Sequence, residues 1–201
     1  MKEKLEMLEN HLKAIDAPVL RLFHPPIEDE IILVNFIHQH WGDNVNIPKE
    51  LIELYKWHNG TKVENPESFH IKFGYFADEL CLNDLSEVNE IILADSPYNF
   101  VEDKLYPFCT SFNGEELAVT LDEQHKVMYC STSDYEIESV ISMYDSLKSF
   151  IDTINTFYEN SCFIINHRGI IGLAEGKYDT YMRIGEKLNP NSDYWRVKRE
   201  F

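Results

Sequence analysis

The sequence predicts an α+β fold in which an antiparallel β-sheet is flanked by N-terminal and C-terminal helices. Three observations support this prediction. Apolar residues recur at helical spacing in residues 5–60, they alternate with polar residues around an Asn-Gly turn in the middle of the chain, and they return to helical spacing after residue 146. Blocks of helices and strands of this kind are typical of α+β proteins rather than of alternating βαβ units. A length of 201 residues, 44% of them hydrophobic, fits one domain with one core.

Two amphipathic helices are expected first. Leucines and an isoleucine at spacings of three and four residues predict a helix over residues 5–15, which must end before Pro18. A second helix follows Pro25-Pro26, with acidic residues in its first turn and Gly42 as its stop. Its inward side is expected to carry Ile31, Val34, Ile37 and Trp41.

A third, short helix begins at Pro48, because the N–H that proline lacks would be unpaired at a first helical position. Asn59-Gly60 ends this helix, since glycine accepts the left-handed conformation of a C-terminal cap. One stripe of the helix carries Leu51, Leu54, Tyr55 and His58.

The middle of the chain changes to the period of a strand. Asn113-Gly114 is a strong hairpin signal, because both central positions of the favoured turn need a positive φ. A fourth helix is inserted near Asn83-Asp84 and presents Leu85, Val88, Ile91 and Ile92 inward. The expected strands are residues 69–73, 105–112, 117–121 and 126–130.

Helices return in the C-terminal part. Ser146 can cap a long helix whose apolar stripe reaches Tyr158. A β-like segment at 163–165, a turn and strand at 169–176, and a last helix over about 179–188 follow. We therefore expect one domain over residues 1–201, in which residues 161–201 could form a C-terminal appendage that packs on the sheet or on the helices.

The charge of the chain restricts its partners. Eighteen Lys and Arg against 35 Asp and Glu give a net charge of −17. Such a chain repels nucleic-acid backbones and anionic membranes, so neither is an expected partner. It attracts basic proteins through long-range steering, although solubility alone would also explain the acidity.

The N-terminal residues and the cysteines indicate a cytoplasmic location. The mixed charges of the first six residues do not fit a signal peptide, and no apolar run approaches the ~20 residues that a bilayer needs. The four cysteines, at positions 81, 109, 130 and 162, are far apart, which suggests a reducing compartment.

The usual catalytic and cofactor motifs are absent from the sequence, so we expect no enzyme, no cofactor and no metal. His38 and His40 would point about 200° apart on a helix and could not share one metal ion. A catalytic pair of Cys162 and His167 is conceivable, but their spacing carries no mechanism, and a structural interpretation is favoured.

Carboxylates are the remaining candidates for a binding site. The fourth helix carries three acidic residues at i, i+3 and i+6, a spacing at which like charges destabilise a helix slightly. A solvated face and a partner-binding face both explain this row. The predicted partner-binding residues, chosen on charge pattern alone, are Asp78, Glu79, Asp84, Glu87, Glu90, Glu115 and Glu116.

Several segments together resemble the SUKH superfamily (Smi/Knr-like). The Pro-started helix with Leu and Tyr inside and Asn-Gly at its exit, residues 47–60, resembles the hallmark of this superfamily. Four further segments resemble, in the expected order, its central hairpin, the strand after it, the helix that succeeds the sheet and a C-terminal element of some bacterial members. These segments are residues 105–121, 126–129, 146–157 and 188–195.

The resemblance implies an α+β fold around an antiparallel sheet and no catalytic residues. Bacterial members of the superfamily are mostly immunity proteins that neutralise partner toxins, often nucleases, and a fungal branch regulates cell-wall assembly through protein contacts. We therefore expect an immunity protein that binds a cognate basic toxin through an acidic surface. The alternative is a non-catalytic regulatory scaffold of the same fold.

Overall fold

The structure is a computed structural model, and it describes residues 1–62, 75–94, 98–111, 113–131, 140–166 and 169–197. The helices are α1 (Lys2–Ala14), the 3-10 helix η1 (Pro18–Arg21), α2 (Glu30–Trp41), α3 (Lys49–Trp57), α4 (Leu85–Leu93), α5 (Leu147–Glu159), α6 (Tyr178–Leu188) and α7 (Tyr194–Val197). The strands are β1 (Tyr75–Ala77), β2 (Leu80–Leu82), β3 (Leu105–Ser111), β4 (Glu116–Thr120), β5 (Val127–Cys130), β6 (Val140–Tyr144), β7 (Phe163–Ile165) and β8 (Ile171–Leu173).

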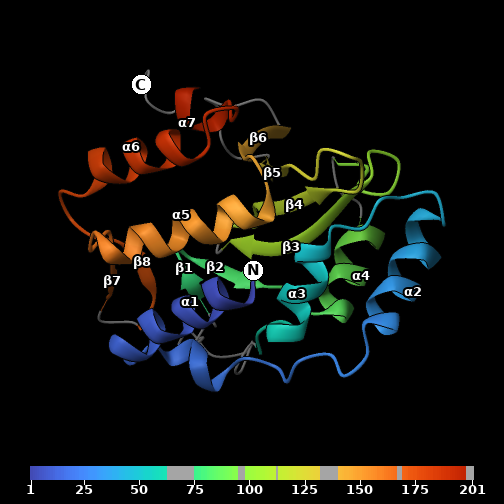
Figure 1. Cartoon of the computed structure of the whole chain (residues 1–201), viewed down its shortest axis with the longest axis horizontal. Helices are drawn as coiled ribbons and strands as arrows, with labels where there is room; N and C mark the ends of the chain where they lie inside the picture. Colours follow the sequence, from blue (N-terminus) through green and yellow to red (C-terminus); the bar gives the residue numbers. More distant parts are fainter. Residues whose placement is uncertain (63–74, 95–97, 112, 132–139, 167–168, 198–201) are drawn as a thin grey trace.

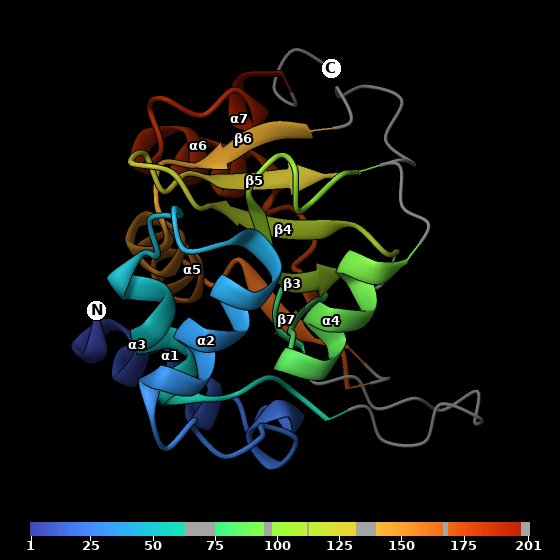
Figure 2. The same cartoon turned by 90° about the vertical axis from the view of Figure 1, so that its right-hand side faces the viewer.

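The main sheet is an antiparallel meander with the strand order β1-β2-β3-β4-β5-β6, and α4 forms the connection between β2 and β3. Figure 2 shows β3 to β6 stacked in this order. The register shifts between Pro107 and Cys109, a bulge at the place where proline has no N–H to give to the ladder. The α+β prediction is confirmed.

One face of the sheet is covered by α5, which α1 joins from the N-terminal part (Figure 1). Ser146 caps α5 as expected: its hydroxyl accepts a hydrogen bond from the Ser149 N–H at 3.1 Å. The apolar stripe of the helix is buried at Leu147, Phe150, Ile151, Ile154 and Phe157.

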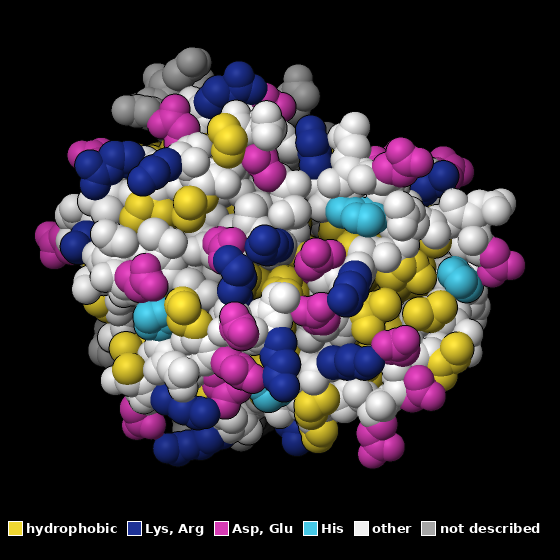
Figure 3. Space-filling model, viewed as in Figure 1, with side chains coloured by type: hydrophobic (Ala, Val, Ile, Leu, Met, Phe, Trp, Pro, Cys, Tyr) yellow, Lys and Arg dark blue, Asp and Glu magenta, His cyan; other side chains and the backbone are white. Residues whose placement is uncertain are grey.

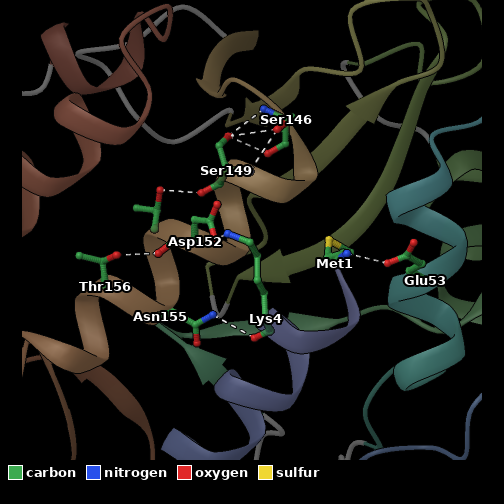
Figure 4. A network of polar contacts seen from close by, with 9 residues as sticks. Met1, Lys4, Glu53, Ser146, Ser149, Asp152, Asn155 and Thr156 are labelled. Atoms are coloured by element: carbon green, nitrogen blue, oxygen red, sulfur yellow. Dashed lines mark hydrogen bonds and ion pairs between the residues drawn. The ribbon is translucent and has the colours of Figure 1, made fainter.

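Polar contacts fix α1 between α5 and α3 (Figure 4). Lys4 of α1 forms an ion pair with Asp152 of α5, and the Asn155 side chain donates to the Lys4 carbonyl at 2.9 Å. The Met1 amine lies 2.9 Å from Glu53 Oε2 of α3. The helices α1, α3 and α5 therefore contact one another and form one layer.

Two sequence predictions on the fold need correction. Helix α2 buries Leu33, Ile37 and Trp41, whereas Ile31 is 51% exposed. Its Ile-Ile-Leu-Val run is apolar on every side, so periodicity alone did not fix the buried face. The sequence patterns also predict none of the strands β1, β2 and β6. The predicted strand at residues 69–73 lies outside the described residues.

The segment after α5 packs on both the helices and the sheet. Helix α6 contacts α5, and α7 contacts α6 and the edge strand β6. The Trp195 ring is fully buried and its Nε1 donates to the Met143 carbonyl at 2.6 Å. Gly185 of α6 allows this close approach, because a Cβ there would lie 2.4 Å from the Trp195 ring.

Candidate partner-binding surface

The exit of α3 holds the start of α4 in place. The Tyr55 hydroxyl donates to the Asn83 carbonyl at 2.9 Å, and the Thr61 N–H donates to the Leu82 carbonyl at 2.9 Å. Gly60, with φ of +86°, touches the Asp84 backbone so closely that a Cβ would lie 2.4 Å from the Asp84 nitrogen. The Asn-Gly segment therefore positions the acidic start of α4.

Asp84 and Glu87 are engaged in the cap of α4. The Asp84 carboxylate accepts from the Glu87 N–H at 2.8 Å, and Glu87 Oε2 accepts from the Asp84 N–H at 2.7 Å, a reciprocal capping box. Burial raises the pKa of Glu87 to about 7. Of Asp84, Glu87 and Glu90, only Glu90 is exposed, and the other two are partly buried. The predicted row of three carboxylates is therefore not one exposed face, and the Asp-x-x-Glu spacing was the signal for the cap.

Glu116 at the start of β4 is buried beside this cap, with only 8% of its surface exposed. The Thr110 hydroxyl lies 2.7 Å from Glu116 Oε2 and 2.8 Å from Asn83 Oδ1. A hydroxyl has one proton and can donate to only one of these two oxygens, so the arrangement is completed when Glu116 is protonated and itself donates. Burial raises the pKa of Glu116 to about 8, in agreement with this geometry.

The remaining predicted carboxylates lie around the turn between β1 and β2. Both residues of this turn have a positive φ, +30° at Asp78 and +62° at Glu79. The Tyr181 hydroxyl of α6 donates to Asp78 Oδ2 at 2.7 Å. Burial raises the pKa of Asp78, and burial with the neighbouring Asp78 and Glu115 charges raises that of Glu79. A positively charged group of a partner would offset this free-energy cost of ionising the two carboxyl groups.

The sheet separates the two groups of carboxylates. Leu117 and its cross-strand partner Tyr129 belong to the main core on the α5 side, whereas Cys130, the partner of Glu116, belongs to a small cluster on the α4 side. Neighbouring residues of a strand point to opposite faces. The side chains of Asp84, Glu87 and Glu116 thus gather on the α4 side, away from those at the β1–β2 turn.

A pocket with a volume of about 210 Å³ opens at the β1–β2 turn. Its walls combine acidic side chains with tyrosines from β5, α6 and α7. The residues that matter here are Asp78, Glu79, Glu115, Tyr129, Tyr181 and Tyr194. Charge pattern found the acidic residues, but no sequence signal connected them to the tyrosines, which lie far away along the chain.

The carboxylates of this surface have few cationic neighbours. Among the described residues, no ion pair includes Asp78, Glu79 or Glu116. By contrast, Lys and Arg are interspersed with Asp and Glu on the face formed by α1, α3 and α5 (Figure 3). The charges are thus balanced locally over the helices, whereas the described residues supply no such ion pair to Asp78, Glu79 or Glu116.

Residues considered for catalysis or metal binding have structural contacts. His38 lies 3.5 Å from Asp43, and the His40 ring packs against Phe36 and Trp41. Cys162 is buried, and His167 lies outside the described residues. In the part of the chain that the structure describes, no three His, Cys, Asp or Glu side chains are placed to hold a metal ion. No helix in that part has the length and apolar character that a membrane crossing needs.

The comparison with protein families supports the resemblance that the sequence motifs indicate. A model of the SMI1 / KNR4 family (SUKH-1) matches residues 36–153, more than half of the chain. The chain belongs to this family. No curated protein matches the chain significantly.

The SUKH-1 match accounts for only part of the pocket. It covers the acidic turn at residues 78–79, the hairpin residue Glu115 and the strand residue Tyr129. Tyr181 and Tyr194 belong to the C-terminal segment, beyond the matched residues. One wall of the pocket therefore lies outside the part of the chain that matches the SUKH-1 family.

Proposed function

We propose that this SUKH-1 protein is an immunity protein, without enzymatic activity, that binds a cognate basic toxin and neutralises it in the cytoplasm. Family membership supports an immunity-type role in general terms. The observation that carries the finer proposal is the pair of carboxylates at the β1–β2 turn, Asp78 and Glu79, for which the described residues supply no ion pair.

A basic partner compensates such a surface. Burial raises the pKa of Asp78, and burial together with neighbouring negative charges raises the pKa of Glu79; an approaching cation favours the ionised form of both groups. The net charge of −17 also accelerates encounter with a positively charged protein. A nuclease toxin fits this description, because the groove that holds a phosphate backbone is basic.

The product of the adjacent upstream reading frame is the partner to test. Cells that produce only this neighbouring gene product should stop growing or die. Co-production of the SUKH-1 chain should restore their growth. The two purified proteins should form a complex at low salt. The proposal fails if the neighbouring product is not toxic, or if the chain neither binds it nor restores growth.

The alternative function, a regulatory scaffold with a neutral or peptide-like partner, makes a different prediction. Its binding would be nearly insensitive to ionic strength, because few charges would be neutralised in the complex. A complex that forms equally well at low and high salt, without any effect on toxicity, supports the scaffold.

A further inference from the structure

The pocket at the β1–β2 turn has walls of two kinds. Asp78 and Glu79 supply carboxylates, and the rings of Tyr129, Tyr181 and Tyr194 supply aromatic surface. A volume of about 210 Å³ suits one side chain rather than a large ligand. The cavity thus offers negative charge and aromatic faces together.

The tyrosine walls are fixed by packing. The Tyr181 ring stacks on Phe157 with their centroids 4.3 Å apart, and its hydroxyl donates to Asp78. The Tyr194 ring lies edge-on to Tyr129 at 5.1 Å and to Trp195 at 5.0 Å. The rings of Tyr181 and Tyr194 are therefore held in place before a partner binds, which lowers the entropy cost of binding.

The acidic wall lacks a counter-charge from the described residues. The Asp78 carboxylate accepts a hydrogen bond from the Tyr181 hydroxyl. Among the described residues, however, no Lys, Arg or His forms an ion pair with Asp78 or Glu79. The Glu79 N–H donates to the Ile171 carbonyl at 2.9 Å, which fixes the turn and keeps both carboxylates beside the cavity.

We infer that this pocket receives an arginine side chain of the protein partner, an inference that rests on the proposed function. The guanidinium group is planar, stays charged and can both bind carboxylates in pairs and stack on aromatic rings. A lysine ammonium is more strongly hydrated and matches the aromatic walls less well. Arginines that fill desolvated pockets often dominate the affinity of an interface.

Capped amino acids test the pocket without the partner. Acetyl-arginine amide, added at millimolar concentration, should produce saturable shifts of the backbone amide resonances of Asp78, Glu79 and Tyr181. Acetyl-citrulline amide, which has the same shape without the charge, should produce none, and acetyl-lysine amide should bind at least several-fold more weakly. No saturation with the arginine probe, or equal shifts with citrulline or lysine, overturns the inference.

A pair of double variants tests the same pocket within the complex. D78N/E79Q and the control E102Q/E123Q each remove two of the 35 acidic residues. Glu102 and Glu123 are exposed and lie outside the pocket. D78N/E79Q should weaken binding of the neighbouring gene product at least tenfold, and E102Q/E123Q less than threefold.

The outcomes separate the two proposals. If the unaltered chain fails to bind or neutralise the neighbouring gene product, the proposed function fails, whatever the arginine probe shows. If the unaltered chain binds but both double variants bind equally well, only the arginine pocket is refuted. Circular dichroism and thermal unfolding serve as the check that each variant is folded. The D78N substitution keeps a side-chain oxygen that can accept the hydrogen bond from the Tyr181 hydroxyl.

Discussion

Gly60 lies directly against the backbone of Asp84, so that a Cβ on Gly60 would be 2.4 Å from the Asp84 nitrogen. The contact joins the exit of α3 to the cap of α4, two elements that are separated by the first strands of the sheet. It gives a physical reason for the Asn-Gly ending of the SUKH-like motif: this position needs both a positive φ and the absence of a side chain.

Replacement of Gly60 by alanine should therefore destabilise the protein strongly. The positive φ costs about 1–2 kcal/mol for an alanine, and the clash with Asp84 adds about 1–3 kcal/mol. Gly176 is the control, because its φ is +72° and a Cβ there would meet nothing within 4 Å. The losses of stability of G60A and G176A in urea unfolding should differ by at least the clash contribution, and equal losses would contradict the packing argument.

Glu116 should make the stability fall as the pH rises. Its pKa is about 8 in the native state against an ordinary value of 4.5, so between these values the native state holds a proton that the unfolded chain has lost. The free energy of unfolding then decreases by up to about 1.4 kcal/mol per pH unit from this group. The stability that Glu116 contributes is complete below pH 4.5 and is lost above about pH 8.

Urea unfolding of E116Q across this pH range checks the effect. The glutamine can still donate to Thr110 and does not titrate, so E116Q should be more stable than the unaltered chain near pH 8, with the difference shrinking toward pH 4.5. E123Q, at an exposed position of the β4–β5 turn, is the control and should follow the unaltered chain. A difference that is the same at every pH would refute the buried proton.

Trp195 should be essential for the packing of the C-terminal segment on the rest of the protein. Its ring is fully buried between β6, α5 and α6, so W195A should cost about 3–5 kcal/mol of unfolding free energy. Replacement of Lys187, which is exposed on α6, should change the stability by about 0.5 kcal/mol or less. Similar losses for W195A and K187A in thermal and urea unfolding would show that this segment contributes little to the core.

Partner binding should weaken as the pH falls. A carboxylate attracts a cation only when ionised, and burial raises the pKa values of Asp78 and Glu79, so protonation removes the attraction at a higher pH than for exposed carboxyl groups. Titration calorimetry with the neighbouring gene product at several pH values measures this dependence. In D78N/E79Q the pH dependence should flatten; an unchanged profile would place the binding charges elsewhere.

Local patterns predicted most of the elements but not the contacts between distant segments. The spacing in α1, α3 and α5 gave their buried stripes, and Asn113-Gly114 gave the β3–β4 hairpin, because these signals act over a few residues. The uniformly apolar start of α2 gave no unique face, and Ile31 was placed inside although it is exposed.

In the candidate site too, the sequence predicts local features but not the contacts between distant residues. Charge pattern pointed to Asp78, but the tyrosine that binds it, Tyr181, lies 103 residues later in a segment beyond the family match. The roles of Asp84 and Glu87 were missed for a different reason, since their capping box is a local signal that was interpreted as surface charge. Tertiary packing, rather than composition, decides which carboxylates remain available to a partner.

The salt dependence of the affinity for the neighbouring gene product tests the central claim most directly. If the carboxylates of the β1–β2 turn, Asp78 and Glu79, bind a basic toxin, the dissociation constant should rise by at least tenfold between about 50 mM and about 500 mM salt, mainly through slower association. The rise should be smaller in D78N/E79Q. An affinity that stays constant over this range, in a complex that still forms, would contradict the account.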